Sequence, residues 1–340
     1  MTGPTISVVV PAYNAAETLG TTLGSLLDQT HEALEVLVVD DGSTDATAAV
    51  IERAAELDDR IVPVDYGANR GRSFARNEGM RRASGEWVAM VDADDLIARD
   101  RFARMVDATR RFPRTRLVTD DRIGWRLDDG GRVVVEHRFP GRHTVRIGST
   151  APLDRRVHFT DRFGHLDLLV HRDFLESTAA TYPQDMAIGE DLAFYNTLLF
   201  WPDDPQPVRV GAPTYYYRLT SSARSAGAPE AHARMVALVV ERTGSDELAD
   251  LYARWGPTHS WLFARADRQL TGAGRLGEPD AAAPVEPAAP NAVTGAAALS
   301  AQKAMQWMGR WADRSLRPGI TADIERQLRR AFPPGTTTDS

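Results

Sequence analysis

The sequence predicts an α/β fold, with a mostly parallel sheet flanked by helices and a mainly helical C-terminal extension. Three observations carry this prediction. Over residues 1–115, short β-rich runs alternate with amphipathic stretches, as in successive βαβ units. The runs are apolar without interruption, which is typical of strands buried on both faces. Helical patterning then resumes at Pro229–Arg242 and Asp246–Gln269.

The first half divides into repeated strand–helix units. Right-handed crossovers would bring the carboxyl ends of their strands to one edge of the sheet, where ligands of open α/β sheets bind. The expected strands are Ile6–Val10, Leu34–Val39, Arg60–Val64 and Trp87–Val91, and the expected helices are Glu17–Leu27, one that Asp45 caps, Ser73–Ala83 and Asp100–Phe112.

The pattern changes in residues 116–225, which we expect to form the second half of the same domain. Arg116–Thr119 predicts one more strand. Asp128-Asp129-Gly130-Gly131 predicts a hairpin turn between two further β-rich runs. Residues 140–163 show no clear periodicity. The expected elements are the hairpin strands Ile123–Leu127 and Arg132–Arg138, the helix Asp191–Phe200 and the strand Thr214–Leu219.

The rest of the chain divides into a helical extension (226–271), an Ala/Pro-rich linker (272–295) and a C-terminal helical segment (296–340). The last segment carries Trp307, Met308 and Trp311 among arginines. Such a stripe suits an interfacial membrane helix. We favour core packing or a homodimer interface, because acidic residues such as Asp313 interrupt the pattern, and we expect membrane contact to be peripheral at most.

Composition excludes several classes of function. Without cysteine the chain has no disulfide, thiolate nucleophile or thiolate-bound metal, so a metal would need oxygen or imidazole ligands. A net charge of −7 argues against nucleic-acid binding. The longest apolar runs are strand-sized and far short of the roughly 20 residues of a membrane span. No secretory signal is visible, so we expect a cytoplasmic protein.

Acidic residues follow two of the predicted strands. Asp40-Asp41 and Asp92-Ala93-Asp94-Asp95 both fall at the ligand-binding edge. Carboxylates this close repel one another unless a cation or donor groups offset the repulsion. One such cluster would indicate a turn rich in Asp. Two clusters at successive strand ends favour a site for Mg²⁺ or Mn²⁺ with substrate phosphates.

Several ordered motifs resemble those of the family 2 glycosyltransferases, which have the GT-A (Rossmann-like) fold. The resemblance covers residues 5 to 220 and is specific because the motifs occur together and in order. The motifs are Val9-Val10-Pro11-Ala12-Tyr13-Asn14, Val38-Val39-Asp40-Asp41-Gly42-Ser43-Thr44-Asp45, Asn69-Arg70-Gly71, Ala75-Arg76-Asn77-Glu78-Gly79, Gly85-Glu86-Trp87, Asp92-Ala93-Asp94-Asp95 and Gly189-Glu190-Asp191.

The resemblance implies that residues 1–115 form the half of the domain that binds a nucleotide-sugar donor, and that residues 116–225 form the acceptor-side half with the catalytic base. Pro11, Ala12 and Tyr13 would line the nucleobase pocket. Asp40 or Asp41 would hydrogen-bond the base, with uracil expected, and Arg70 or Arg76 would lie near the base or phosphates. Across Asp92-Ala93-Asp94, Asp92 would contact the ribose or a metal-bound water, and Asp94 would ligate Mn²⁺ or Mg²⁺ on the diphosphate.

The resemblance also implies an inverting reaction with Asp191 as general base. Glu190 and Arg218 would lie near the acceptor or a closing loop. For Glu190 and Asp191 the alternative is charge that complements a helix dipole. Arg76 and Asn77 are as well explained by a structural tie. The motif and membrane spans of the family's processive synthases are missing, so we expect transfer of one sugar. The acceptor would be a glycan, lipid, peptide or small molecule.

Two other functions compete with this one. A sugar-phosphate nucleotidyltransferase would carry a Gly-rich loop after the first strand, where this chain has Pro11-Ala12-Tyr13-Asn14. A non-catalytic nucleotide-sugar-binding protein would have no use for Asp191. A zinc site at His137, His143, His158, His165 and His171 is disfavoured by their spacing, although His165 or His171 would suit an acceptor contact.

Overall fold

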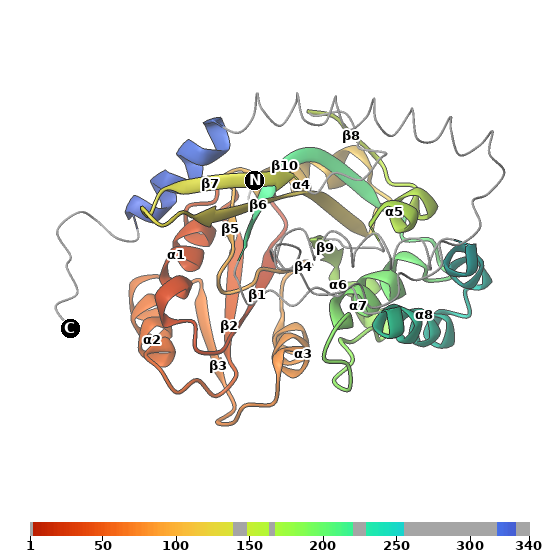
Figure 1. Cartoon of the computed structure of the whole chain (residues 1–340), viewed down its shortest axis with the longest axis horizontal. Coiled ribbons are helices and arrows are strands. Elements are labelled where there is room, and N and C mark those ends of the chain that lie inside the picture. The colour runs from red at the N-terminus through yellow and green to blue at the C-terminus, as the bar shows by residue number, and fades with distance from the viewer. Residues whose placement is uncertain (1–2, 139–147, 163–166, 220–228, 255–317, 331–340) are drawn as a thin grey trace, which may run out of the picture.

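The computed structural model describes residues 3–138, 148–162, 167–219, 229–254 and 318–330. These residues form one mixed sheet with helices on both faces (Figure 1). The strand order is β3-β2-β1-β4-β9-β6-β10-β5, with β7 on β6 and β8 on β10. The strands are β1 (Ile6–Ala12), β2 (Leu34–Asp40), β3 (Ile61–Asp65), β4 (Trp87–Met90), β5 (Leu96–Ile97), β6 (Leu117–Leu127), β7 (Val133–Arg138), β8 (Thr150–Pro152), β9 (Leu168–His171) and β10 (Val208–Arg218).

The predicted parallel half is confirmed. β3, β2, β1 and β4 run parallel, so their carboxyl ends share one edge. In this register Val9 lies between Leu37 and Met90, and Ala12 is opposite Asp40. The strands form as expected because their side chains are buried on both faces.

The second half of the sheet departs from the prediction. β9 runs antiparallel to both β4 and β6, while β10 is parallel to β6. The two runs expected as separate strands, Arg116–Thr119 and Ile123–Leu127, form the single strand β6. The run Thr214–Leu219 is the end of the longer strand β10. The hairpin around Asp128-Asp129-Gly130-Gly131 is confirmed by the antiparallel pairing of β6 with β7.

Five elements escaped the sequence prediction, namely β5, β8, β9, α5 (Arg155–Arg162) and α6 (Arg172–Thr178). β9 has only four residues, and β5 only two. α5 lies in the region without clear periodicity and has just two apolar side chains, Val157 and Phe159. The helices are α1 (Ala16–Leu27), α2 (Thr47–Leu57), α3 (Arg72–Arg82), α4 (Arg101–Arg111), α5 (Arg155–Arg162), α6 (Arg172–Thr178), α7 (Glu190–Leu199) and α8 (Pro229–Thr243).

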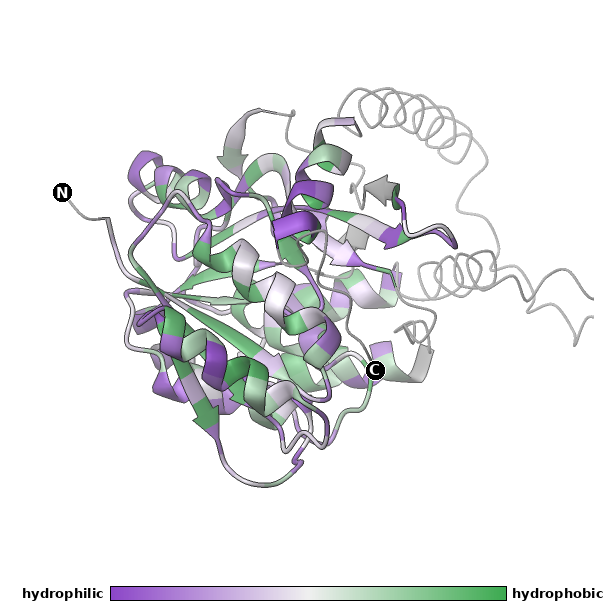
Figure 2. Ribbon diagram, turned by 90° about the vertical axis from the view of Figure 1, so that its left-hand side faces the viewer, coloured by the Kyte–Doolittle hydropathy of each residue, from purple (hydrophilic) through white to green (hydrophobic). Residues whose placement is uncertain are grey.

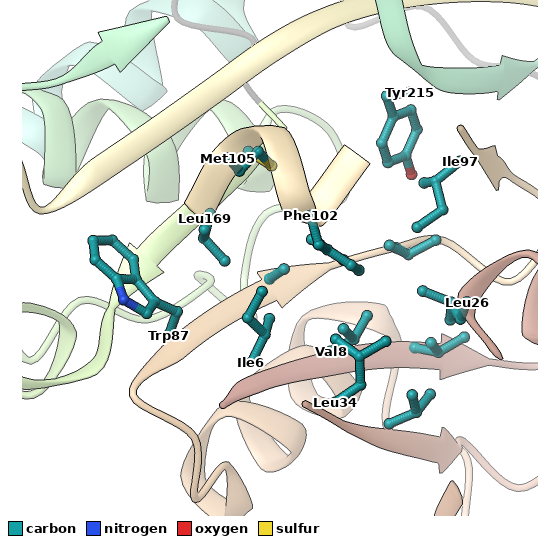
Figure 3. Close-up of a cluster of buried hydrophobic side chains, with 14 of the residues drawn as sticks. Ile6, Val8, Leu26, Leu34, Trp87, Ile97, Phe102, Met105, Leu169 and Tyr215 are labelled. Carbon is teal, nitrogen blue, oxygen red and sulfur yellow. The ribbon is translucent and has the colours of Figure 1, made fainter. Parts of the chain in front are cut away.

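The core lies on both faces of the sheet. Helices α1, α2 and α4 bury their apolar sides on one face, against strand residues such as Ile6 and Trp87 (Figure 3). Helices α3, α7 and α8 cover the other face, around Val9 and Leu192. Figure 2 shows hydrophobic residues concentrated on the strands and on the inner sides of the helices. This packing fixes the strand ends and the helix termini that form the site.

The end of the chain also packs on this sheet. Residues 318–330 form a helix that lies beside β7 in Figure 1. Ile320 and Ile324 are buried in a third cluster with Leu96, Trp125 and Tyr216. The expected linker (272–295) and the stripe with Trp307, Met308 and Trp311 lie outside the described residues. In the described part of the chain no helix has the length and hydropathy of a transmembrane span.

Candidate active site

The turn after β4 presents the acidic motif at the carboxyl edge of the sheet. The backbone N–H of Asp95 donates to the carbonyl of Asp92 at 3.1 Å and closes the turn. Ala93 is buried, and its carbonyl accepts from the Thr22 hydroxyl of α1 at 2.9 Å. The side chains of Asp92 and Asp94 are both partly exposed, whereas Asp95 is fully buried. The turn therefore offers two carboxylates to a ligand and keeps the third inside the protein.

Arg76 joins this turn to the start of α7. Its guanidinium is buried, with Nη2 2.8 Å from Asp92 Oδ1 and Nη1 3.2 Å from Glu190 Oε1. Burial is the largest single influence on the pKa of Arg76 and lowers it, but Asp92, Tyr182 and Tyr195 together more than offset this, so the pKa is raised and the guanidinium stays charged. Arg72, one turn earlier on α3, binds Glu190 through Nε at 2.6 Å. Two motifs that are 98 residues apart in the chain (190 − 92) thus meet at one arginine.

The N-terminus of α7 carries both acidic residues of the late motif. Gly189 has φ of 82°, a conformation that favours glycine and that turns the chain into the helix. Glu190 is almost completely buried and binds the two arginines, while Asp191 is partly exposed. Burial, and then the charge of Asp191, raise the pKa of Glu190, which Arg72 and Arg76 oppose. Glu190 therefore holds α7 against α3, and Asp191 is the one that solvent reaches.

The electrostatic environment of Asp94 favours the binding of a cation. Burial and the neighbouring charge of Asp92 raise its pKa to about 6, against a smaller opposite effect of Arg218. No group of three or more acidic or histidine side chains in the described ranges has the arrangement of a metal site. The two partly exposed carboxylates of the turn fit Mn²⁺ or Mg²⁺, because proteins commonly hold these ions by one or two carboxylates together with substrate phosphates. Asp94 and Asp92 would be the protein's share of such a site.

The structure separates the roles of Asp40 and Asp41 at the end of β2. Asp41 is saturated by its own fold, because Oδ1 accepts from the Tyr66 hydroxyl at 2.5 Å and from the Arg70 N–H at 2.7 Å, and Oδ2 accepts from the Gly71 N–H at 2.8 Å. Asp40 accepts only from the Ser43 N–H, through Oδ1 at 2.9 Å. Among the described residues Oδ2 of Asp40 has no hydrogen-bond partner, so Asp40 is the better base-binding candidate.

Gly42 explains why the loop after β2 can lie so close to the loop after β3. Its φ is 69°, and a Cβ there would come within 2.7 Å of backbone atoms of Ala68 and Asn69. Any other residue would push these loops apart. The two loops carry Asp40, Asp41 and Arg70, so this glycine sets the spacing of the expected nucleobase pocket.

The residues after β1 complete this side of the site. Ala12 is buried, Pro11 is partly exposed and Tyr13 is 50 % exposed, so the Tyr13 ring is available to a ligand. Asn14 ties this loop to the one after β2, since its Oδ1 accepts from the Thr44 N–H at 2.8 Å. Arg70 is also exposed, and its guanidinium lies 3.6 Å above the Phe74 ring. The exposed Tyr13 and Arg70 are thus free to meet a nucleotide, while Arg76 is engaged with carboxylates.

Arg218, at the end of β10, lies close to Asp94. Its guanidinium is over the Trp125 ring, 5.7 Å from the centroid, and it borders a cavity of about 310 Å³ together with Asp94, Trp125 and Leu328. A larger cavity of about 700 Å³ lies near the start of β10, by Arg114 and Val208, and contains none of the predicted site residues. We therefore assign the smaller cavity to the site, because it is lined by Asp94 and Arg218.

Several expectations need correction or completion. Asn77 is a structural tie, because its side-chain amide exchanges two 2.8 Å hydrogen bonds with the Tyr182 backbone. His171 lies opposite Trp87 at the start of β4, away from the acidic turn that follows the end of that strand, so it does not suit an acceptor contact. His158 is buried within α5. His143 and His165 lie outside the described residues, as does the side chain of His137.

Two residues of the site were missed from the sequence. Arg72 was not singled out, although it precedes Arg76 by four positions and so shares its helix face. Asp95 was given no role of its own within the acidic motif, but it binds Tyr215 and the Arg218 backbone from β10. Spacing signalled the first of these contacts. Nothing in the sequence pointed to the second, since β10 lies 120 residues further along the chain.

The sequence is similar to those of known proteins. Residues 7–155 match the family described as Glycosyl transferase family 2. The succinoglycan biosynthesis protein ExoO of Rhizobium meliloti is 32% identical over 190 residues, which cover 55% of this chain and 53% of ExoO. The putative teichuronic acid biosynthesis glycosyltransferase TuaG of Bacillus subtilis is 38% identical over 104 residues, which cover 31% of this chain and 41% of TuaG. The chain thus spans about half the length of these curated relatives or less.

Solved structures share the fold. S. aureus TarS in complex with UDP superposes with a TM-score of 0.59 at 20% identity, over 78% of this chain and 74% of that one. The Pyrobaculum calidifontis mannosyltransferase PcManGT, in complex with GDP-Man and Mn²⁺, superposes with a TM-score of 0.50 at 19% identity, over 97% and 87% of the two chains.

Proposed function

Since this chain belongs to glycosyl transferase family 2 through residues 7–155 and has the GT-A fold, we propose that it is an inverting, metal-dependent glycosyltransferase. It moves one sugar from a nucleoside-diphosphate donor to an acceptor hydroxyl. The observation that carries the proposal is the contact of Arg76 with both Asp92 and Glu190. This contact brings the carboxylates that suit a metal-bound diphosphate close to the helix start that bears Asp191.

Asp191 is the proposed general base. It is the partly exposed carboxylate of the late motif, whereas Glu190 has both oxygens committed to Arg72 and Arg76. Inversion requires the acceptor hydroxyl to attack one face of the anomeric carbon while the diphosphate leaves from the other. A carboxylate positioned to take the hydroxyl proton typically contributes 10²–10⁴-fold to the rate.

Asp94, with Asp92 beside it, is the proposed protein ligand for Mn²⁺ or Mg²⁺. When bound, the cation neutralises negative charge on the departing diphosphate, so a protein acid is not needed there. Asp92 is held by Arg76, and this fixes its direction relative to the ribose and the diphosphate. Arg218 is a positive charge near Asp94, and its proposed role is to attract phosphate oxygens of the donor.

The donor base is proposed to lie against Tyr13, with Asp40 accepting from the base. Asp40 rather than Asp41 takes this role because Asp41 is saturated by the loop after β3. TarS was solved with UDP and with UDP-GlcNAc, which supports uracil. PcManGT was solved with GDP-Man, so guanine is the base to test against it. The relatives named for succinoglycan and teichuronic acid synthesis favour a glycan acceptor.

The test separates binding from chemistry. Calorimetry with UDP and with GDP, each in MnCl₂, measures the nucleotide, and hydrolysis of UDP-GlcNAc or GDP-Man with and without acceptor measures turnover. We expect Asp191→Asn to retain nucleotide binding while turnover falls about 10²–10⁴-fold. Asp94→Asn, or EDTA with the wild type, should strongly weaken nucleotide binding and abolish turnover. Glu56→Gln on the exposed side of α2 is the control. Undiminished turnover in Asp191→Asn or in EDTA would contradict the proposal.

A further inference from the structure

Tyr215 reaches from β10 to the acidic turn after β4. The side chain is buried, and its hydroxyl makes two hydrogen bonds with the turn. It donates to Asp95 Oδ2 at 2.7 Å and accepts from the backbone N–H of Asp92 at 3.2 Å. One phenol therefore connects the first and last residues of the motif Asp92-Ala93-Asp94-Asp95, from a strand more than 100 positions away.

Asp95 makes a second connection to the same strand. It is completely buried, and its Oδ1 accepts from the backbone N–H of Arg218 at 2.7 Å. Both carboxylate oxygens are thus occupied by β10, one by Tyr215 and one by Arg218. A side chain buried in this way does not touch a substrate. Its effect on the reaction has to pass through the position of the turn that it anchors.

The Tyr215 ring is itself fixed. The guanidinium of Arg101 is 5.0 Å from the ring centroid and that of Arg122 is 5.4 Å from it. Arg101 forms a fully buried ion pair with Asp120, and Arg122 pairs with Asp167 at 2.5 Å. Figure 3 shows the ring beside Ile97, with its hydroxyl directed away from β10. The ring is therefore held by two guanidinium groups that are each paired with a carboxylate, so its hydroxyl can keep the turn in a fixed position.

We propose that Tyr215 and Asp95 are positioning residues, which hold the Asp92–Asp94 turn in the geometry that binds the donor diphosphate with its divalent cation. The inference rests on the proposed function. Its physical basis is that three carboxylates in four residues repel one another. The turn needs fixed donors to keep Asp92 and Asp94 directed to solvent. Tyr215 and the Arg218 backbone supply those donors from outside the turn.

Tyr216 provides a matched control, which tests whether the hydroxyl of Tyr215 does no more than stabilise the fold. Tyr216 is the next residue of β10 and is equally buried, and its hydroxyl donates to Asp323 Oδ2 at 3.0 Å. That bond leads to the helix of residues 318–330 and not to the turn. Tyr215→Phe and Tyr216→Phe each delete one hydroxyl bound to an Asp carboxylate. If the hydroxyl of Tyr215 only stabilised the fold, the two variants would behave alike.

The experiment uses the full chain and calorimetric titration with UDP, and with GDP, in MnCl₂. For the nucleotide that the wild type binds, we expect Tyr215→Phe to raise the Kd about tenfold, as for loss of a hydrogen bond to a charged group. The MnCl₂ concentration that gives half-maximal binding should rise as well. Tyr216→Phe should stay within about twofold of the wild type. Asp95→Asn cannot accept from both Tyr215 and Arg218, so it should repeat the Tyr215→Phe result.

The outcomes distinguish this inference from the proposed function. If the wild type binds a nucleotide and Tyr215→Phe matches Tyr216→Phe in both measurements, the positioning role is overturned and the proposed function stands. If the wild type binds neither nucleotide in MnCl₂, the proposed function fails and the positioning role fails with it. Melting temperatures for both tyrosine variants verify that each is folded, and a loss of affinity confined to Tyr215→Phe supports the inference.

Discussion

Arg76 and Asp92 form an ion pair in which Nη2 lies 2.8 Å from Oδ1, and the same guanidinium reaches Glu190 through its other terminal nitrogen. The planar guanidinium holds its two terminal nitrogens in fixed, separate positions, which suits carboxylates that approach from different elements. The compact ammonium of a lysine has donors for two carboxylates but does not reproduce this geometry. The pair therefore fixes the distance between the turn after β4 and the start of α7, on which the proposed chemistry depends.

Arg76→Lys tests this dependence. The substitution retains the positive charge but not the fork, so we expect turnover of the nucleotide sugar to fall at least about tenfold, with a smaller loss of nucleotide affinity. Steady-state kinetics and calorimetry provide the measurements. Arg81→Lys is the control, because Arg81 lies on the same helix, is exposed and binds only Glu78. Equal turnover in the two variants would show that the Arg76 fork is dispensable.

Asp40→Asn and Asp41→Asn should separate ligand binding from stability. Asp41 accepts from three donors, and an amide nitrogen would face one of them, so Asp41→Asn should cost about 1–3 kcal/mol of unfolding free energy. Asp40→Asn keeps an oxygen for the Ser43 N–H and should leave stability almost unchanged while weakening nucleotide binding about tenfold. Urea denaturation and calorimetry on both variants check this, and the reverse pattern would assign the base contact to Asp41.

Binding of a nucleotide sugar with Mn²⁺ should weaken at acidic pH. Asp94 has its pKa raised to about 6 and is ionised only above that value, so protonation competes with the cation as pH falls below about 6. We expect the Kd of UDP-GlcNAc or GDP-Man in MnCl₂ to rise between pH 7 and pH 5. The diphosphate diester of these donors does not titrate in this range. Asp94→Asn should show weak binding with no such pH dependence.

Without metal, the stability of the fold should change with pH in the opposite direction to nucleotide-sugar binding. A carboxyl with a raised pKa in the folded state binds its proton more tightly than in the unfolded state. The destabilisation of the fold therefore grows as pH rises from the ordinary value of 3.8 to about 6, and is fully present above that. In EDTA, Asp94→Asn should therefore melt higher than the wild type at pH 8, and the difference should vanish as pH falls toward 4. A constant difference across this range would contradict the proposed environment of Asp94.

Ile324 should prove important for stability although it lies far beyond the catalytic motifs. It is completely buried against the cluster that contains Leu96 and Trp125. Ile324→Ala should lower the unfolding free energy by about 2–5 kcal/mol, as measured by urea denaturation. Arg326→Ala on an exposed face of the same helix should cost less than about 1 kcal/mol. Similar small losses in both variants would mean that the helix contributes little to the domain.

The elements that the sequence predicted well are those with a strong local signal. β1, β2 and β4 follow from apolar runs, and the acidic clusters follow from their positions just after β2 and β4. The elements that were missed have a weak signal or none. β9 is too short for a pattern, and it is the strand that makes the second half of the sheet antiparallel at β4 and β6.

The residues of the site also divide into those with a local sequence signal and those without one. Asp94 could be singled out from its position, because a turn after a buried strand exposes its polar residues by local geometry. Asp191 was named from the family resemblance and the order of its motifs. Asp95 could not be singled out, because in sequence it is one more acidic residue of the turn. Its burial is decided by β10, which places Tyr215 and the Arg218 N–H against it. The choice between Asp40 and Asp41 likewise depended on the loop after β3.

By itself, then, the sequence determined which segments form the strands of the parallel half, the edge of the sheet that their carboxyl ends share and the carboxylates at that edge. These depend on side-chain periodicity and on interactions between near neighbours in the chain. The tertiary structure decided which carboxylates face solvent and which are tied internally, and how far the turn after β4 lies from α7. Those properties come from contacts such as Arg76 with Glu190 and Tyr215 with Asp95, which join residues 114 and 120 positions apart and leave no local pattern to read.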